Sequence, residues 1–531
     1  MWKLIALVFL GMLNQSFAQV QHYVDFWDDG GKIKRSEGDY DAGTEQGPWT
    51  FWFDDGKVQE ESNFFHGRLH GSVKRYYRSG KLMHEGYFLL GRQDSIMRSF
   101  NDKGTLVEEG YFLKGDKTGL WNYFYNDGSE FMVEEYKDST MYLWSFVDST
   151  AKRLIDGGNG KLISKFRSGI LKEEKSYING LNDGSYLKNH FNGKPREQGL
   201  YVEGLKHGEW TSYYSSGIIE EQKTYNKGLI EGSYKSNYRE GQHKIKGNYL
   251  DGKKDGIWTW YMEDGAKDME GPFVRDLQHG DWKFYYANGN VQYEGTYDMG
   301  SMEGEWTYYY WEGELWKKGP MSANKKVGFW TSWFENGKKL QEGNFKNDME
   351  EGAWQSWYES GKEKDSGNFR AGLMHGKWLG WYPNSVKNYS GEWTDNQKSG
   401  MWSHYWENGQ LNETGAYKVG VKDGHWEAYN ENGRPEMKGA YKNGRPNGKW
   451  EYFYENGALL REHEYLEGKT HGRVRGYSQQ GRLIEELNYK NGKLDGDLIR
   501  YNEKNGDKEQ HYIYENGKVI KVVMDAKIKM K

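Results

Sequence analysis

The residues best suited to acid–base or metal chemistry in this sequence are its histidines. Five of them stand immediately before a recurring glycine: His70, His207, His279, His375 and His471. A metal site needs several ligands that converge on one point, whereas these histidines recur at one place of a repeat along a chain of 531 residues. We therefore interpret them as a preference of a turn, and we predict no metal site.

Other catalytic patterns are missing or have a structural explanation. The carboxylate pairs Glu220-Glu221 and Glu485-Glu486 are neighbours in sequence, so on a strand they point to opposite faces and cannot act as an acid–base pair. The sequence has no cysteine, which removes thiol nucleophiles, thiolate zinc sites and disulfides together. No glycine-rich segment has the strand-to-helix context of a phosphate loop. We predict a non-enzymatic protein with no cofactor.

The most regular feature of the chain is a tryptophan at intervals of 24 positions. The tryptophans on this spacing are Trp258, Trp282, Trp306, Trp330, Trp354, Trp378, Trp402, Trp426 and Trp450. A fixed period in the twenties is typical of stacked repeats in which each unit contacts its neighbours. We take the tryptophan as position 0 of the repeat and predict that these nine side chains are structural.

Each repeat has the pattern of a β-hairpin. Glycine recurs at positions −2, +7 and +13, and an aromatic residue recurs at +15. The +7 glycine often follows asparagine, as in Asn288-Gly289 and Asn408-Gly409, and Asn-Gly is a strong hairpin signal. Asn443-Gly444 and Asn491-Gly492 indicate a second tight turn between units. The predicted fold is all-β: an elongated single-layer antiparallel sheet of tandem 24-residue β-hairpin repeats.

The expected turn also predicts which positions face each other. A two-residue turn at +6 and +7 pairs positions that sum to 13. The tryptophan at 0 then faces the glycine at +13, and the glycine at −2 faces the aromatic at +15, so each ring lies across bare backbone. Position +4 pairs with +9 on the face of position 0, while +1, +3, +10 and +12 lie on the opposite face. A β-bulge within the unit would change this assignment.

The candidate binding residues are aromatics at position +3, on the face opposite the tryptophans. The row is Tyr285, Tyr309, Trp333, Trp357, Trp381 and Tyr405. Other positions of this face are mostly Lys, Glu, Thr, Ser and Gln. The aromatics either stabilise the sheet by covering lysine stems or form binding platforms for a partner. We predict a binding surface, densest at Trp333, Trp357 and Trp381.

The N-terminus resembles a secretory signal peptide over residues 1–18. Lys3 precedes an apolar stretch from Leu4 to Leu13, and Ser16 and Ala18 form a small-x-small cleavage site. We expect cleavage near Ala18 and an exported product, periplasmic or extracellular. The apolar stretch is too short to span a bilayer comfortably and no later segment is long enough, so we predict no transmembrane segment.

The remaining chain divides by the phase of the repeat. Residues 19–128 form an N-terminal array and residues 161–517 a C-terminal array. Between them, residues 129–160 form a degenerate joint, because Trp121 and Leu162 are 41 positions apart and not 48. Residues 518–531 have no repeat and read as a capping strand whose lysines protect the sheet edge. A formal net charge of −5 with interspersed signs argues against a nucleic-acid partner.

The repeat resembles the MORN repeat in its bacterial variant form. The shared pattern is Gly-x-Trp-x-x-Tyr-Tyr-x-Asn-Gly followed by Glu-Gly-x-Tyr-x-x-Gly, and Trp402–Gly420 and Trp450–Gly457 have it most clearly. The resemblance implies a twisted single sheet with an aromatic-lined groove that contacts protein or lipid and does no catalysis. Bacterial proteins of this kind are often described as toxin-neutralising, a role that fits badly with an export signal. A weaker similarity links the chain to choline-binding and glucan-binding cell-wall repeats, whose aromatics are contiguous and whose period is shorter.

These observations lead to three functional hypotheses. The first is an exported repeat scaffold that mediates protein–protein interaction at the bacterial cell envelope. The second is glycan or cell-wall binding through the +3 aromatics, and the third is a toxin-neutralising, antitoxin-like binding protein.

Overall fold

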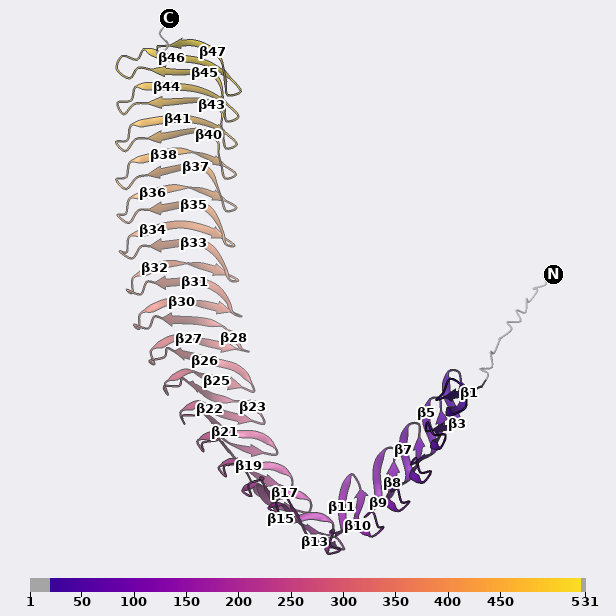
Figure 1. Cartoon of the computed structure of the whole chain (residues 1–531). Helices are drawn as coiled ribbons and strands as arrows, with labels where there is room; N and C mark the ends of the chain where they lie inside the picture. Colours follow the sequence, from indigo (N-terminus) through magenta and orange to yellow (C-terminus); the bar gives the residue numbers. More distant parts are fainter. Residues whose placement is uncertain (1–19, 527–531) are drawn as a thin grey trace, which may run out of the picture. The chain divides into compact units, whose positions relative to one another are not determined.

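The computed structural model describes residues 20–526, which form one antiparallel sheet of 47 strands in chain order (Figure 1). The described residues contain no helix, and none therefore that could cross a membrane. The end strands β1 and β47 each pair with one neighbour, so the sheet is open. The predicted all-β single-layer sheet of tandem hairpins is confirmed. The predicted signal peptide, residues 1–18, lies outside the described residues.

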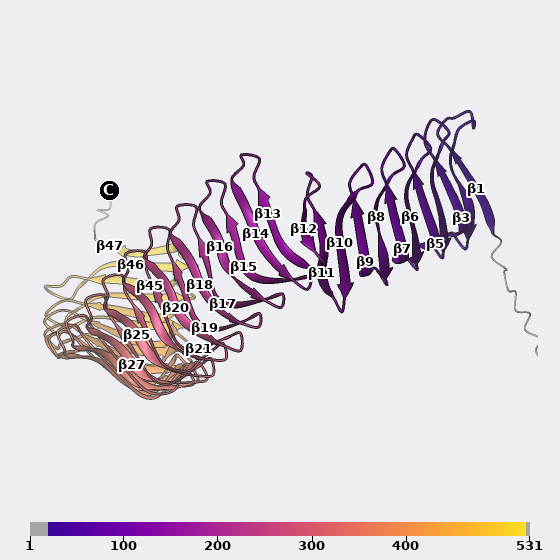
Figure 2. The ribbon, with the colours of Figure 1, turned by 90° about the horizontal axis from the view of Figure 1, so that it is seen from below.

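The chain divides into two compact units, Met1–Lys253 and Lys254–Lys531. In each, strands lie side by side with turns along both edges (Figures 1 and 2). The strands of the first unit are β1 (Gln21–Phe26), β2 (Lys34–Asp41), β3 (Thr44–Trp52), β4 (Val58–Phe65), β5 (Arg68–Tyr76), β6 (Leu82–Leu89), β7 (Arg92–Phe100), β8 (Leu106–Leu113), β9 (Asp116–Phe124), β10 (Glu130–Lys137), β11 (Thr140–Val147), β12 (Arg153–Asp156), β13 (Asn159–Lys165), β14 (Leu171–Ile178), β15 (Leu181–Asn189), β16 (Pro195–Val202), β17 (Leu205–Tyr213), β18 (Ile219–Asn226), β19 (Leu229–Asn237) and β20 (His243–Leu250).

The strands of the second unit continue the same pattern, beginning at the unit boundary. They are β21 (Lys253–Tyr261), β22 (Lys267–Val274), β23 (Leu277–Gln278), β24 (Gly280–Tyr285), β25 (Val291–Asp298), β26 (Ser301–Tyr309), β27 (Leu315–Ser322), β28 (Lys325–Lys326), β29 (Gly328–Trp333), β30 (Lys339–Lys346), β31 (Met349–Trp357), β32 (Glu363–Arg370), β33 (Leu373–Trp381), β34 (Lys387–Thr394), β35 (Gln397–Tyr405), β36 (Leu411–Lys418), β37 (Val421–Tyr429), β38 (Pro435–Lys442), β39 (Arg445–Pro446), β40 (Gly448–Phe453), β41 (Leu459–Leu466), β42 (Lys469–Thr470), β43 (Gly472–Tyr477), β44 (Leu483–Lys490), β45 (Lys493–Tyr501), β46 (Lys508–Glu515) and β47 (Lys518–Asp525).

The predicted register is confirmed in the half of each hairpin that lies away from its own turn. Trp282 pairs with Gly295, and Gly280 pairs with Tyr297, as the sum of 13 requires. The tight turn between units is also confirmed. At Asn443-Gly444 both residues have positive φ, 51° and 78°, which is the two-residue turn that matches the twist of the flanking strands.

The predicted two-residue turn at +6 and +7 is wrong. Tyr286 N–H donates to the carbonyl of Asn290 at 2.8 Å, and Gly289 N–H donates to the carbonyl of Tyr286 at 2.9 Å. Only Gly289 in this loop has positive φ, 88°, so the loop has three residues: a type I turn followed by a left-handed glycine. Tyr285 at +3 therefore pairs with position +9, and the pairing shifts by one residue between +2 and +3.

This bulge exchanges the predicted faces of +9 and +10. The ammonium group of Lys267, at +9, lies 6.0 Å from the ring centroid of Tyr285 at +3. Trp316, at +10, instead contacts Tyr308 at +2, with ring centroids 6.3 Å apart. The prediction that +4 pairs with +9 on the tryptophan face is wrong because the extra residue inverts the alternation on one strand.

Glycine is required at positions −2 and +13 for reasons other than those predicted. Gly304, at −2, has a φ of 65° and no heavy atom within 4 Å of a Cβ built on it, so its backbone conformation is what requires glycine. A Cβ on Gly295, at +13, would overlap the indole ring of Trp306. The tryptophan ring thus lies across the glycine of the preceding repeat, and not across its own pairing partner.

The packed face is a continuous ladder of rings. The nine tryptophans at 24-residue intervals are all buried. Tyr417, at +15, stands edge-on to Trp426 of the next repeat, with centroids 5.1 Å apart and an angle of 90°, a favoured aromatic geometry. The Trp426 indole N–H donates to the carbonyl of Ala416 at 3.0 Å. Since each ring covers the neighbouring repeat, a single layer hides its apolar face without a second sheet.

The sheet stays paired through residues 129–160. The hairpin of β12 and β13 is short, with two pairs between the strands. The backbones of neighbouring turns meet there: Gly180 N–H donates to Gly158 at 2.9 Å, and Leu143 N–H donates to Gly180 at 2.7 Å. Leu143, Ile155 and Tyr177 form a small core beneath these turns.

Candidate functional site

The six aromatics at +3 lie on the face opposite the tryptophan ladder. Each is the last residue of its strand, so the row runs beside the edge formed by the three-residue turns. Positions 0 and +3 lie on one strand with no extra residue between them, and successive side chains of a strand point to opposite faces. The +3 side chains therefore lie on the face opposite the tryptophans, as predicted. The side chains of all six residues are half-buried and not fully exposed.

Two tyrosines of the row donate hydrogen bonds to carboxylates. The Tyr285 hydroxyl donates to Glu270 at 2.6 Å, and the Tyr309 hydroxyl donates to Glu294 at 2.8 Å. Burial and this bond to Glu294 raise the pKa of Tyr309 to about 12. Burial disfavours the Glu294 carboxylate, but hydrogen bonds from Tyr309 and Lys283 outweigh it and lower the pKa of Glu294.

The carboxylate at the equivalent position is missing for two of the three tryptophans of the row, while Glu342 keeps it for Trp357. The +12 position that supplies Glu270 and Glu294 is occupied by Lys318 before Trp333 and by Ser366 before Trp381. Lys339 lies 5.3 Å from the Trp357 ring centroid, but in residues 20–526 no cation lies over the rings of Trp333 and Trp381. Within the described chain, the side chains of Trp333 and Trp381 therefore have neither the carboxylate partner nor a covering cation.

A groove of about 410 Å³ lies on this face and is lined by residues other than Trp333, Trp357 and Trp381. Its lining combines apolar, amide and charged groups, among them Phe329, Ala353, Leu379, Gln355, Asn368, Ser366, Glu342, Glu363 and Lys377. The groove exists because Ala353 and Ser366 are small, and Phe329 on its rim is 50% exposed. The sequence prediction missed these residues, although the sequence shows that one repeat has the small residues Ala353 at −1 and Ser366 at +12 where the preceding repeat has Phe329 and Glu342.

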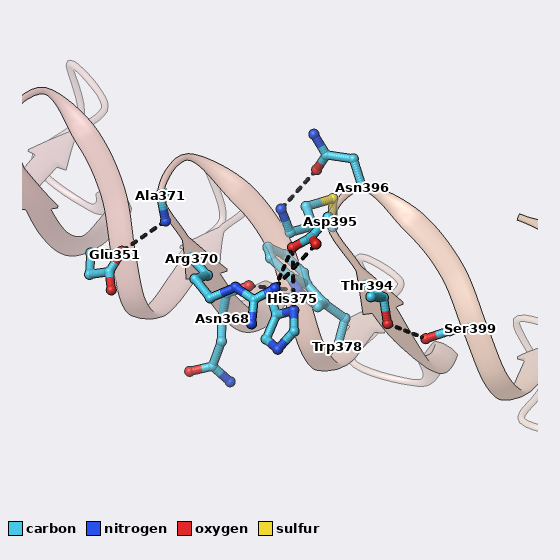
Figure 3. Close-up of polar contacts among 11 residues, drawn as sticks. Glu351, Asn368, Arg370, Ala371, His375, Trp378, Thr394, Asp395, Asn396 and Ser399 are labelled. Carbon is cyan, nitrogen blue, oxygen red and sulfur yellow. Dashed lines mark hydrogen bonds and ion pairs between the residues drawn. The ribbon is translucent and has the colours of Figure 1, made fainter. Parts of the chain in front are cut away.

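The histidines before the −2 glycine lie close to the turns at the other edge, and His70, His207 and His375 are within strands. The His375 ring lies 3.7 Å from Asp395, which also accepts a 2.8 Å bond from Arg370 (Figure 3). At the equivalent place in another repeat, His471 accepts the N–H of Asn491 at 3.4 Å. These contacts join one turn to the next and agree with the predicted turn role. Among the residues that the structure describes, no group of three histidine, aspartate or glutamate side chains has the arrangement of a metal site.

Comparison with known families identifies the repeat. A family model described as MORN repeat variant matches nine segments, namely residues 45–66, 69–89, 206–227, 278–299, 326–347, 398–418, 422–443, 446–467 and 470–491. These segments fall in both units and include strands on either side of the tryptophan part of the row.

Comparison with whole proteins adds little. No curated protein sequence matches the chain. Among solved structures, the crystal structure of TcdB2-TccC3-Cdc42 is 10% identical, with 88% of this chain and 28% of that chain covered and a TM-score of 0.13. The crystal structure of TcdB2-TccC3 is 11% identical, with coverage of 91% and 32% and the same TM-score of 0.13. The chain thus spans about a third of the length of these proteins, and superpositions this poor carry no argument.

Proposed function

The chain belongs to the MORN repeat variant family, whose repeats form interaction scaffolds, and on this premise we propose that it is an exported, non-enzymatic scaffold that binds a protein partner at the bacterial cell envelope. The binding surface in this proposal is the +3 row, centred on Trp333, Trp357 and Trp381. The signal-like segment ending at Ala18 supports export to the periplasm or the extracellular space.

One observation carries the proposal: three consecutive repeats replace tyrosine by tryptophan on a face that also carries a groove. Tyr285 and Tyr309 use their hydroxyls within the sheet, whereas an indole at the same place offers more apolar area and keeps an N–H donor. Tryptophan is enriched among residues that dominate protein interfaces. The amides of Gln355 and Asn368 in the groove can pair with the backbone or polar groups of a bound chain.

A second candidate function is glycan or cell-wall binding by the same surface. Flat aromatic rings on the same face as the polar groove residues Gln355, Ser366 and Asn368 also suit a sugar, which has apolar ring faces and a polar rim. The toxin-neutralising hypothesis requires the same surface to bind a toxin, and the export segment weighs against a cytosolic version of it.

The test is a capture experiment with a triple variant of the row. The full chain, expressed with its first 18 residues, is purified from the periplasm or medium, and N-terminal sequencing is expected to find a start near Gln19. Envelope proteins captured by the wild type are expected to be lost with Trp333→Ala, Trp357→Ala and Trp381→Ala combined, because an interface concentrates its energy in such residues.

The matched control changes the same repeat position elsewhere: Tyr429→Ala, Phe453→Ala and Tyr477→Ala combined. It is expected to keep the partners. Equal capture by both triple variants would refute the proposed surface. Retention of the wild type, but not of the tryptophan variant, on purified peptidoglycan would favour the glycan function instead.

A further inference from the structure

The packed face contains an internal cation site that recurs in several repeats. Lys422, at −4, places its ammonium group 3.7 Å from the ring centroid of Trp426. The same group pairs with Glu413, at +11 of the preceding repeat, at 2.8 Å. Two further repeats have this trio: Lys117 with Trp121 and Glu108, and Lys206 with Trp210 and Glu197. The fold therefore holds an alkylammonium between an indole face and a carboxylate.

At Trp378 the lysine of this trio is missing and the carboxylate remains. Position −4 is Met374, and position +11 of the preceding repeat is Asp365. Asp365 accepts the Tyr389 hydroxyl at 2.7 Å and the Ser356 hydroxyl at 3.3 Å. It makes no ion pair within residues 20–526. The acceptor is thus positioned by two neutral donors, and no positive group of the described chain compensates it.

A hollow of about 310 Å³ occupies the space beside this carboxylate. It is walled by Trp354, Phe369 and Trp378, with Ser356 and Asp365 among its polar groups. Trp354 and Trp378 are 9% and 7% exposed. In comparison, Trp426 under its lysine is 0% exposed, so the hollow uncovers indole surface that other repeats hide.

The hollow arises from the residues at position +2. In several other repeats this position carries a ring that covers the tryptophan ladder, as Phe284 and Tyr308 do. In three consecutive repeats it is Ser332, Ser356 and Gly380. Both the +2 ring and the −4 lysine are missing at Trp354 and at Trp378, the two tryptophans that wall the hollow. Of these two, Trp378 has a carboxylate, Asp365, at +11 of the preceding repeat, where Trp354 has Gln341.

We propose that this hollow binds a primary alkylammonium group supplied from outside, namely a lysine side chain of a partner protein. The methylene stem lies against Trp378 and Phe369, and the ammonium group reaches Asp365, as Lys422 does with Trp426 and Glu413. Glu350 and Lys364 also line the hollow. The Lys364 ammonium lies over the Tyr358 ring, 5.9 Å from its centroid, which leaves the indole faces accessible.

Trp357 of the +3 row also lines the hollow, whereas the proposed contacts are made by Asp365, Trp378 and Phe369, which lie outside the row. The double variant Trp333→Ala with Trp381→Ala disturbs the row without touching the hollow and is expected to keep the site. A failure of either proposal leaves the other intact.

The experiment is a calorimetric titration of the full chain with Nα-acetyl-lysine N-methylamide as the probe. One saturable site is expected, weakened by salt because the contact is partly ionic. Met374→Lys supplies the cation internally, and Asp365→Asn removes the negative charge with little change of shape. Each is expected to weaken probe binding at least about tenfold, with the fold checked by circular dichroism.

Two controls make the outcome decisive. Met302→Lys is the same substitution at the same repeat position, where Phe284 occupies +2 and no carboxylate stands at +11; it is expected to leave the probe's affinity unchanged. Neither the uncharged norleucine analogue nor choline, which has no N–H for Asp365, is expected to bind as tightly. Absence of saturable binding, unchanged binding in Met374→Lys and Asp365→Asn, or tighter binding of choline would overturn the proposal.

Discussion

At the scale of the residue, the repeat depends on a glycine that no other residue can replace. The indole of each tryptophan lies across the +13 glycine of the preceding repeat, with no room for a Cβ. The −2 glycine is different, because the space around Gly304 is empty and only its positive φ of 65° excludes other residues. Glycine is therefore required at positions +13 and −2 for two different physical reasons.

The first prediction distinguishes the ring contact at +13 from the backbone conformation at −2. Gly295→Ala is expected to lower the free energy of unfolding by about 3 kcal/mol, because a methyl group forced into a packed ring contact displaces a buried indole. Gly304→Ala is the matched control and is expected to cost about 1 kcal/mol from backbone strain alone. Urea unfolding followed by tryptophan fluorescence measures both. Equal losses would contradict the ring contact at Gly295.

At the scale of the element, the hairpin shows what sequence can and cannot predict. The register of Trp282 with Gly295 follows from periodicity, and the face of position +3 follows from alternation along a single strand. Asn288-Gly289 identifies the turn correctly, but the pair is compatible with a two-residue and a three-residue loop. The faces of +9 and +10 depend on that choice, so they could not be predicted.

The same limit applies to the candidate sites. The aromatic row lies before the bulge and was predictable in position and face. The hollow is lined by Ser356, Asp365 and Trp378, which come from three different strands. Their proximity depends on the pairing between repeats, where the register of β32 with β33 shifts between Ser366 and Asn368, and no spacing rule within one repeat contains this shift.

A prediction at this scale concerns the asparagine of the three-residue turn. Asn408 accepts the N–H of Gln410 at 2.9 Å and donates to the carbonyl of Glu431 in the next repeat at 2.7 Å. Asn408→Ala is expected to cost about 1 kcal/mol of stability, since both bonds are solvent-exposed. Hydrogen exchange of the Gln410 and Gly409 amides is expected to accelerate.

The control for this prediction is Glu407→Ala, in the same turn. It removes an exposed carboxylate and is expected to change stability by less than about 0.5 kcal/mol. Asn408→Asp keeps the acceptor and loses the donor, so an intermediate loss is expected. If Asn408→Ala behaves like Glu407→Ala, the side chain does not link the two repeats.

At the scale of the whole molecule, stability is a sum over repeats that contact only their neighbours. Tyrosine is the commonest aromatic residue, with 42 in the chain. Burial raises the pKa of Tyr308 to about 12. The hydrogen bond to Glu427, together with burial, raises the pKa of Tyr429 to about 12. Since the raised pKa means that folding favours the neutral phenol, the sheet has a distributed sensitivity to alkali.

The corresponding prediction is an alkaline loss of stability. The contribution of these tyrosines is complete below about pH 10, where the unfolded chain is also neutral, and is lost as pH rises through about 12. The melting temperature is expected to fall across this window, and phenolate absorbance is expected to lag behind that of the unfolded chain. Tyr309→Phe is expected to reduce the alkaline fall in melting temperature, because it removes one of the tyrosines with a raised pKa. Phenols of the folded protein that ionise near pH 10, with an unchanged melting temperature, would contradict it.

The order of the strands has a mechanical consequence. Because the strands follow each other in chain order and the end strands β1 and β47 have one partner each, a force applied to the two chain ends pulls the outermost strand away from its neighbour. The hydrogen bonds of that pair then open one after another, and not all at once. Each 24-residue repeat released in this way adds about 80 Å of extended chain. The protein is thus expected to lengthen under tension in uniform steps of low force, with the remaining repeats still folded and able to hold their partners.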